Sequence, residues 1–403
     1  MANLWPRNPT GAETEIRRRV AADGPLTFAD FMGLALYAAD GGFYTSGSPF
    51  GAGGDFYTAP LTHPAFGALV ARHARELWRG AGSPERWWLI EAGAGGGQLS
   101  RDVLAASDGS FAQALRYVAI DPSARAADAA VAWVRSGALP VRGLRGLVLA
   151  NELLDALPVH RVTIADGVLR EIRVGVDGDG RFEDVLTAPT LGLAERLAGL
   201  DVRLGQGHRA EVCLAVDDWF ADAGHGMEAG YVLLIDYGHE AEAYYEASRG
   251  RGTLRTYYQH LLGMDPYTHV GSQDISVHVE WTSVRRAAIA AGFSFAGTTT
   301  QAAFLRGLGF DALRTAMAAR RDVPAPVRVA NLRALDMLVD PEGMGKFNVM
   351  AFAKGVPDAG VMGLGVGTGA FEGPAPLATA AHMPFGGAAT VPMVMPTWDE
   401  LSR

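Results

Sequence analysis

The stretch that decides the fold is WWLIEAGAGGGQ, residues 87–98, where a short apolar run leads into an acid and a cluster of glycines. The apolar run predicts a buried strand, and residues 99–106 predict a helix. Glycine permits backbone torsions and close approaches that a Cβ would prevent. A turn that contains Gly93, Gly95 and Gly97 can therefore lie flat against a ligand at the carboxyl end of a strand. The segment predicts the strand–turn–helix unit of a doubly wound α/β sheet.

Further apolar runs repeat this pattern along the chain. Residues 116–121, 146–150 and 231–236 predict three more buried strands, and residues 346–354 alternate as expected for the last strand. We expect a helix over residues 123–135, directly after the strand at residues 116–121. Short apolar strands that alternate with helices indicate a mostly parallel sheet covered on both faces.

The composition divides the 403-residue chain into three parts. Residues 1–85 predict N-terminal helices followed by a glycine-rich lid. Residues 86–355 predict the core, with insertions at about 160–230 and 241–283 that carry substrate-side elements. Residues 356–403 are rich in Gly, Ala, Pro and Met and carry few charges, which indicates a flexible or loosely docked tail.

Bulk properties argue against several classes of function. The net charge is −9 and no dense run of Lys or Arg occurs, which disfavours a nucleic-acid partner. The single cysteine, Cys213, cannot form an internal disulfide, and no cluster of Cys and His resembles a metal site. No stretch approaches the ~20 apolar residues of a membrane span. Residues 1–15 lack the apolar core of a signal peptide, so we expect a cytoplasmic protein.

The spacing of the glycines favours one nucleoside cofactor over another. A dinucleotide-binding turn would place glycine or alanine at position 98, which is Gln98 here. This difference favours S-adenosylmethionine over a nicotinamide cofactor. Asp121 ends the next strand, where a carboxylate can accept both ribose hydroxyls in either class of protein. The alternative is a structural turn that packs helix on sheet, with Asp121 as a helix cap.

The segment NELLDALPVH, residues 151–160, follows the third predicted strand and predicts the place of chemistry. In an open α/β sheet this position is the rim of the ligand crevice. Asn151, Glu152 and Asp155 can reach the cofactor or an incoming nucleophile. Paired carboxylates suit a cationic acceptor such as a guanidinium, which they can bind in a bidentate manner. The structural alternative is that Asp155 caps a turn and Glu152 pairs with an arginine.

Three more segments are candidates for the same rim. His239, which closes the stretch DYGH (236–239), can act as a base near neutral pH or serve the structure alone. Residues 271–280 alternate polar and apolar side chains, as in a pocket lining or a half-exposed strand. The glycine-rich and aromatic loop at 51–60 predicts a lid that closes over the cofactor, with a surface loop as the alternative.

Several motifs in one order resemble a known family. They are GAGGDFYTAP (51–60), a helix with Phe66-Gly67, EAGAGGG (91–97), NELLDALPVHR (151–161), DYGHE (236–240), GTLRTYYQH (252–260), GSQDISVHVEW (271–281) and TTQAAFLRGLG (299–309). From about residue 13 to 355 the chain is similar to the MidA-like class I methyltransferases. That family includes a mitochondrial complex I assembly factor that dimethylates an arginine of a complex I subunit.

The resemblance implies a Rossmann-like methyltransferase sheet whose last strand is antiparallel. It also implies a set of residues around S-adenosylmethionine: Glu91, Gly93, Gly95, Gly97, Asp121 and Asn151, with Asp55 and Thr58 of the lid nearby. Asn151, Glu152 and Asp155 would face the methyl group. The chain departs from the family pattern at Ala59, where a serine is common. It also departs at Ala94 and Gly96, where a proline and a basic residue are common.

These observations predict an S-adenosylmethionine-dependent methyltransferase that acts on an arginine of a protein, by resemblance a subunit of respiratory complex I. Methylation of a small molecule or of another peptide nitrogen is one alternative. A non-catalytic assembly factor that binds the cofactor is a second, and a nicotinamide-dependent oxidoreductase is a third. We expect no nucleic-acid partner, no membrane span and no metal, and a homodimer is compatible with the sequence.

Overall fold

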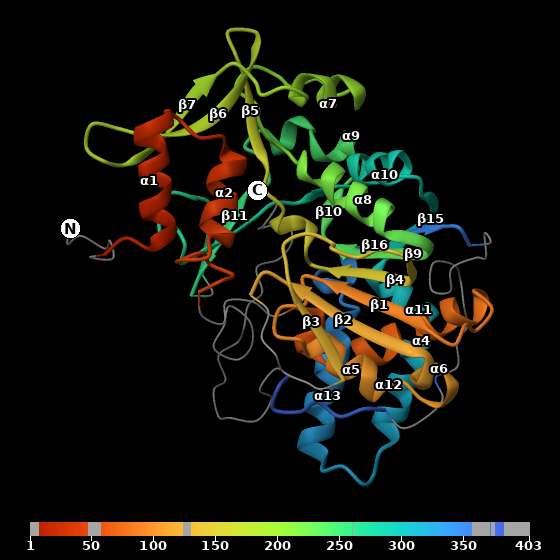
Figure 1. Cartoon of the computed structure of the whole chain (residues 1–403). Helices are drawn as coiled ribbons and strands as arrows, with labels where there is room; N and C mark the ends of the chain where they lie inside the picture. The colour runs from red at the N-terminus through yellow and green to blue at the C-terminus, as the bar shows by residue number, and fades with distance from the viewer. Residues whose placement is uncertain are drawn as a thin grey trace.

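The computed structural model describes residues 8–46, 58–123, 130–259, 261–356, 371 and 375–382. Its centre is a seven-stranded sheet in the order β15-β16-β9-β4-β1-β2-β3 (Figure 1). The strands are β1 (Trp87–Ala92), β2 (Leu115–Asp121), β3 (Val131–Arg135), β4 (Leu144–Asn151), β9 (Met227–Asp236), β15 (Ser294–Thr300) and β16 (Asn348–Lys354). Strand β16 runs antiparallel to both of its neighbours, and the remaining pairs are parallel. The α/β fold with an antiparallel last strand is confirmed.

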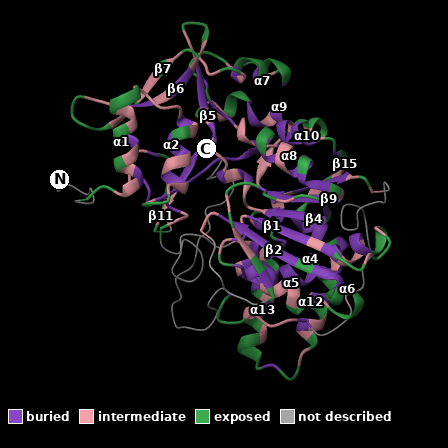
Figure 2. Ribbon diagram, viewed as in Figure 1, coloured by how far each residue is buried: buried purple, intermediate pink, exposed green. Residues whose placement is uncertain are grey.

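Helices cover both faces of this sheet because its strands are apolar on both sides. One face packs against α4 (Ala65–Gly80), α5 (Gln98–Ala105), α6 (Gly109–Ala114), α11 (Gln301–Gly307), α12 (Phe310–Ala319) and α13 (Ala325–Leu338). The other face packs against α8 (Ala215–Gly226) and α10 (Trp281–Ala290). Leu147 and Leu149 of β4 face the first group, while Val148 faces the second. Figure 2 shows the resulting buried centre, with exposed residues on the outer helices.

The predicted helix over residues 123–135 is wrong at its carboxyl end. Val131–Arg135 form strand β3, which pairs in parallel with β2 at the edge of the sheet. The β-branched Val131 and Val134 and the aromatic Trp133 favour a strand, and the edge of β2 offers unpaired backbone groups. Residues 124–129 lie outside the described part of the chain.

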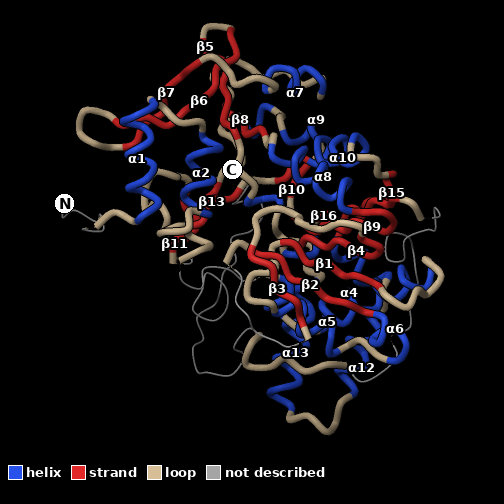
Figure 3. Tube along the Cα trace, in the orientation of Figure 1, coloured by secondary structure: helices blue, strands red, loops and turns tan. Residues whose placement is uncertain are grey.

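A second, antiparallel sheet is built from the first insertion. Its strands are β5 (His160–Ala165), β6 (Val168–Val176), β7 (Phe182–Thr187) and β8 (Arg209–Val212), in the order β7-β6-β5-β8. Helices α1 (Gly11–Asp23) and α2 (Phe28–Tyr37) pack against this sheet and not against the core (Figure 3). A backbone bridge joins Leu26, between the two helices, to Val174 of β6. The first helices and the insertion therefore form one lobe.

The remaining elements of the described chain are short. They are α3 (Ala59–Thr62), η1 (Leu154–Ala156), α7 (Leu193–Gly199), β10 (Gly238–His239), α9 (Ala241–Tyr244), η2 (Ala247–Arg249), β11 (Arg255–Tyr258), β12 (Leu261–Gly263), β13 (Asp274–Ser276), β14 (Val279–Glu280) and η3 (Met344–Lys346). Strands β12, β11 and β13 form a small sheet, and β10 pairs with β14. Within the described ranges, none of the helices combines the length and apolar character that a bilayer crossing needs.

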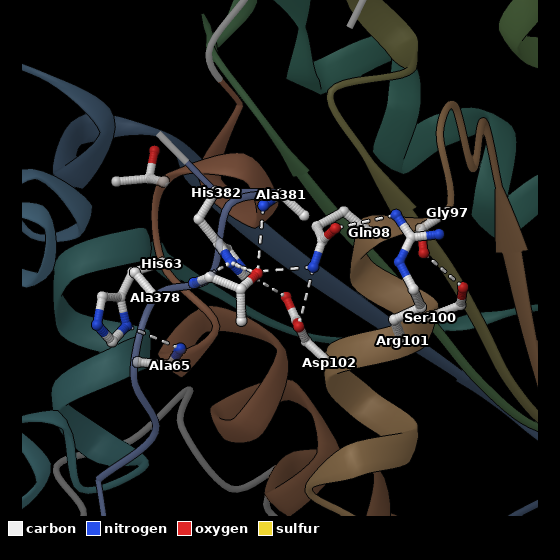
Figure 4. Close-up of polar contacts among 12 residues, drawn as sticks. His63, Ala65, Gly97, Gln98, Ser100, Arg101, Asp102, Ala378, Ala381 and His382 are labelled. Atoms are coloured by element: carbon white, nitrogen blue, oxygen red, sulfur yellow. Dashed lines mark hydrogen bonds and ion pairs between the residues drawn. The ribbon is translucent and has the colours of Figure 1, made fainter. Parts of the chain in front are cut away.

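Residues 375–382, near the end of the chain, pack against the core beside α5 (Figure 4). His382 is 2% exposed. Its Nδ1 accepts a hydrogen bond from Thr379 N at 3.1 Å, so its proton lies on Nε2 and is donated to Asp102 Oδ2 at 3.0 Å. Asn331 Oδ1 accepts from Ala378 N at 2.8 Å. This segment is thus fixed to the helix that follows the glycine turn.

This contact makes a prediction about stability. His382→Ala should lower the free energy of unfolding by about 1–3 kcal/mol, because it removes a buried ring and the hydrogen bond that this ring donates to Asp102 Oδ2. Thermal denaturation measures the change, which we expect to be about 2 °C or more. His225→Ala, at an exposed site on α8, is the matched control. Equal melting temperatures for both variants would show that the segment adds no stability.

Candidate active site

The glycine turn between β1 and α5 needs glycine for two physical reasons. Gly93, Gly95 and Gly97 have φ values of 72°, 52° and 71°, in the region that side-chain-bearing residues avoid. A Cβ on Gly97 would also lie 2.6 Å from the ring of Trp133 on β3. The predicted turn is therefore present, and its tight packing depends on the strand that sequence analysis missed.

Two acids lie at the ends of β1 and β2, beside this turn. Glu91 is 4% exposed and accepts a hydrogen bond from the Tyr117 hydroxyl at 2.7 Å. Burial raises the pKa of Glu91 to about 8. Asp121 accepts from the backbone N–H of Gly95 at 2.9 Å and from that of Ser123 at 2.8 Å. The Asp121 carboxylate thus lies directly against the turn, where the sequence placed a ribose ligand.

Asn151, at the end of β4, adds a polar group to the same edge of the sheet. Its Nδ2 donates to Glu152 Oε1 at 3.0 Å. Its Oδ1 is buried and has no hydrogen-bond partner among the described residues. An unpaired buried acceptor costs about 1–3 kcal/mol. A hydrogen-bond donor on a ligand beside Asn151 would remove that cost. Glu91, Asp121 and Asn151 together therefore fit a cofactor that has two ribose hydroxyls and an amino group.

Glu152 is held in a strained but well-supported position. Its φ is 52°, which is unusual for a residue with a side chain, and its N–H donates to Ile235 O at 2.8 Å. Its Oε1 accepts from Ala59 N at 3.2 Å as well as from Asn151. Burial, followed by the negative charge of Asp155, raises the pKa of Glu152 to about 8. An unpaired negative charge here is costly, which favours a cationic ligand.

Asp155 lies close by and is oriented by its neighbours. The Tyr237 hydroxyl donates to Asp155 Oδ2 at 2.7 Å, and burial raises the pKa of Asp155 to about 6. Asp236, which is 1% exposed, accepts from Leu154 N at 2.9 Å and so fixes the turn that carries both acids. The charge of Asp155 contributes to the pKa shift of Glu152, so the two carboxylates lie near each other. Asp236 is a structural support that the sequence did not distinguish.

The predicted lid is described only at its end. Asp55 and residues 51–57 lie outside the described part of the chain. The Thr58 carbonyl accepts from Leu61 N at 3.0 Å and begins α3. Since the next residue, Ala59, donates to Glu152, the end of this segment contacts the candidate acceptor site directly.

His239 lies against a second histidine. Its ring lies against His278, with centroids 5.3 Å apart. Burial and the positive charge of Arg249 lower its pKa to about 4. A group with this pKa is a weak proton acceptor at neutral pH, which favours the structural alternative for His239.

Sequence analysis missed the tyrosines of this site. The Tyr37 hydroxyl, at the end of α2, donates to Ala156 O at 2.9 Å, and its ring stacks on Tyr44 at 5.5 Å. The aromatic residues near the Gly41-Gly42 pair were the only signal in the sequence. Residues 274–278 are buried, which agrees with the pocket-lining interpretation of that segment. The described residues contain no group of three or more side chains suited to a metal.

Comparisons with known proteins agree with this arrangement. A family model described as "Putative S-adenosyl-L-methionine-dependent methyltransferase" matches residues 69–299, more than half of the chain. A mitochondrial protein arginine methyltransferase NDUFAF7 homologue of Drosophila melanogaster is 29% identical and covers 85% of this chain and 84% of its own length. The Homo sapiens NDUFAF7 protein is 27% identical, with coverages of 83% and 81%.

One similar protein of known structure contains the demethylated cofactor. A Burkholderia thailandensis protein crystallised with S-adenosyl-homocysteine is 30% identical, with a TM-score of 0.76, and covers 85% of this chain and 92% of its own. A native crystal structure from the same organism is 29% identical, with a TM-score of 0.75. The glycine turn and its flanking acids thus lie in a fold that this similar protein shares, and that protein binds S-adenosyl-homocysteine.

Proposed function

The chain belongs to the family of S-adenosyl-L-methionine-dependent methyltransferases whose model matches residues 69–299, and on that premise we propose that it methylates an arginine side chain of a protein. The observation that carries this proposal is the pair of carboxylates, Glu152 and Asp155, beside the cofactor edge of the sheet. Relatives named as protein arginine methyltransferases support it at 23–29% identity.

The electrostatics of the carboxylates favour a guanidinium. Burial raises the pKa of both Glu152 and Asp155, so each negative charge lacks a full counter-charge in the described residues. A guanidinium stays protonated at all working pH values and donates two parallel hydrogen bonds to a carboxylate. Binding it would restore both pKa values towards their ordinary range. A neutral acceptor would leave the two buried carboxylates without a counter-charge, so a neutral acceptor is disfavoured.

The cofactor supplies an electrophilic methyl group bound to a sulfonium sulfur. Glu91, Asp121, Asn151 and the glycine turn are the residues that would hold it. The protein orients the acceptor: Tyr237 fixes Asp155, while Ala59 N and Asn151 fix Glu152. Methyl transfer to a guanidinium nitrogen releases one proton. Glu152, whose carboxylate is ionised once the guanidinium is bound, is the group that accepts this proton.

Radiolabelled S-adenosylmethionine tests this proposal. The purified protein is incubated with cell lysate and with recombinant complex I subunits, and the labelled protein is hydrolysed to amino acids. We expect label in methylarginines. Label in methyllysine, or in small molecules alone, would contradict the arginine assignment and leave a methyltransferase of other specificity. S-adenosyl-homocysteine binding without any labelled product would indicate a non-catalytic binding protein.

A further inference from the structure

Residues 375–382, which we call the strap, are fixed at both ends to helices that cover the sheet. Near the start of the strap, Ala375 O accepts a hydrogen bond from Arg320 Nη1, directly after α12, at 3.1 Å. At its end, His382 Nε2 donates to Asp102 Oδ2 of α5 at 3.0 Å. Ala375 and His382 are 1% and 2% exposed, so both ends of the strap are buried.

His382 and Gln98 donate to the two oxygens of one carboxylate. His382 Nε2 donates to Asp102 Oδ2, and Gln98 Nε2 donates to Asp102 Oδ1 at 3.0 Å (Figure 4). The two donor nitrogens lie 3.2 Å apart. Gln98 is 6% exposed and is the first residue of α5, directly after Gly97 of the glycine turn. Gln98 therefore connects the strap to the turn.

The first turn of α5 is the place where the strap can influence the cofactor. The first N–H groups of a helix have no acceptor within the helix, so a ligand at the glycine turn can use them. Their direction depends on how α5 begins. Arg101 Nη2 donates to Gln98 Oε1 at 2.9 Å, and Asp102 holds the other end of the same amide. Without His382, Asp102 Oδ2 loses a donor, and the carboxylate that orients Gln98 can turn away.

The middle of the strap contacts the segment that ends at the candidate acceptor site. Asn331 Oδ1 of α13 accepts from Ala378 N at 2.8 Å and from His63 Nε2 at 3.0 Å. Burial lowers the pKa of His63 to about 4, so this ring is neutral at working pH. His63 directly follows α3, whose Ala59 N donates to Glu152. Hydrogen bonds through Asn331 and His63 thus join the strap to the element that positions Glu152.

We propose that His382 is a positioning residue for the cofactor, which acts through Asp102 and Gln98 to hold the glycine turn in the geometry that binds S-adenosylmethionine. A coupling free energy between two sites is reciprocal, so the bound cofactor also stabilises the docked strap. This assignment depends on cofactor binding and not on the identity of the methyl acceptor.

Two substitutions of His382 separate this role from simple packing, since both remove the ring. Glutamine places an amide nitrogen close to the position of Nε2 and can donate to Asp102. Asparagine places an oxygen close to the position of Nδ1 and can accept from Thr379 N, but it does not reach Asp102. Each variant therefore keeps one of the two hydrogen bonds of the histidine.

Calorimetric titration of S-adenosyl-homocysteine into the full-length proteins measures the effect. We expect His382→Asn to weaken binding by about fivefold or more, as for a typical coupling between sites. His382→Gln should bind within about twofold of the wild-type affinity, because the bond to Asp102 is kept. His225→Ala, at the exposed site on α8, is the control for loss of a histidine and should bind as the wild-type protein does.

Amide hydrogen exchange of the wild-type protein tests the coupling from the other side. Saturating S-adenosyl-homocysteine should slow exchange in the strap by about fivefold or more. Two of its amides have identified acceptors, Ala378 N on Asn331 and His382 N on Thr379 O. Residues 168–176, in the insertion sheet, report the general change on binding. This measurement needs no variant, so it decides the matter where either His382 variant does not fold.

The outcomes separate the proposal from a purely structural role. Weaker binding by His382→Asn than by His382→Gln supports it. Binding by His382→Asn that equals or exceeds that of His382→Gln overturns it, and so does unchanged exchange in the strap where the exchange measurement decides. These results leave the proposed arginine methylation in place. A wild-type protein that does not bind S-adenosyl-homocysteine would overturn both.

Discussion

Glu152→Gln should reduce methyl transfer by about 30-fold or more while S-adenosyl-homocysteine still binds. Glutamine keeps the shape of the side chain and an oxygen that can accept from Ala59 N and Asn151. It loses the negative charge that holds the acceptor, and such a loss costs about 2–5 kcal/mol at a buried charge pair. Single-turnover rates with labelled cofactor measure the effect. Wild-type turnover in this variant would remove Glu152 from the mechanism.

The same variant should be more stable than the wild-type protein at alkaline pH. The pKa of Glu152 rises from its ordinary value of 4.5 to about 8 on folding. The folded protein therefore binds more protons than the unfolded chain between these pH values, and its stability falls as pH rises through this window. Glutamine does not titrate. The melting temperature of the variant should match that of the wild-type protein near pH 4.5 and exceed it most above pH 8.

An exposed glutamate provides the control for this comparison. Glu195→Gln on α7 removes one negative charge at the surface, far along the chain from the site. We expect wild-type turnover and a melting difference that does not grow between pH 4.5 and 8. A pH-dependent gain in Glu195→Gln equal to that in Glu152→Gln would mean that net charge, and not the buried carboxylate, causes the effect.

Gly97→Ala should weaken cofactor binding by about tenfold or more and lower stability by about 1–3 kcal/mol. The left-handed torsion at this position disfavours a side chain, and the new Cβ would lie 2.6 Å from Trp133. The turn must move to relieve this contact, and with it the backbone that faces the cofactor. Calorimetric titration of S-adenosyl-homocysteine measures the affinity, and thermal denaturation measures the stability.

The neighbouring glycine is the matched control. Gly96 is exposed, and a Cβ built there has no heavy atom within 4 Å. An added methyl group meets no neighbour there, so Gly96→Ala should leave both affinity and stability unchanged. If Gly96→Ala and Gly97→Ala weaken binding equally, the torsion and packing at Gly97 are not the reason for its glycine.

The sequence predicted those parts of the site that follow from local pattern. The apolar run before the glycines forms β1, and Glu91 and Asp121 lie at the carboxyl ends of β1 and β2. Glu152 and Asp155 lie in the segment that directly follows β4. Each follows from the rule that the carboxyl ends of neighbouring strands meet at one edge of the sheet. These predictions needed no knowledge of contacts between distant segments.

The parts that sequence analysis missed depend on distant contacts. Strand β3 exists because the edge of β2 pairs with it, which outweighed the helical reading of residues 123–135. Tyr37 and Tyr44 reach the rim because α2 packs on the insertion sheet. His239 was expected to titrate near neutral pH, but its surroundings, formed by other segments, lower its pKa. Burial by remote residues is not encoded in a local pattern.

The packing of α1 and α2 on the insertion sheet has a consequence for synthesis of the chain. Leu26 pairs with Val174, so the first helices leave the ribosome long before their partner strand exists. At a translation rate of about 5–20 residues per second, the wait is about 7–30 seconds. During that time the apolar face of α2, with Phe28, Phe31 and Met32, has no native surface to cover it. We therefore expect this face to stay exposed until β6 has been synthesised.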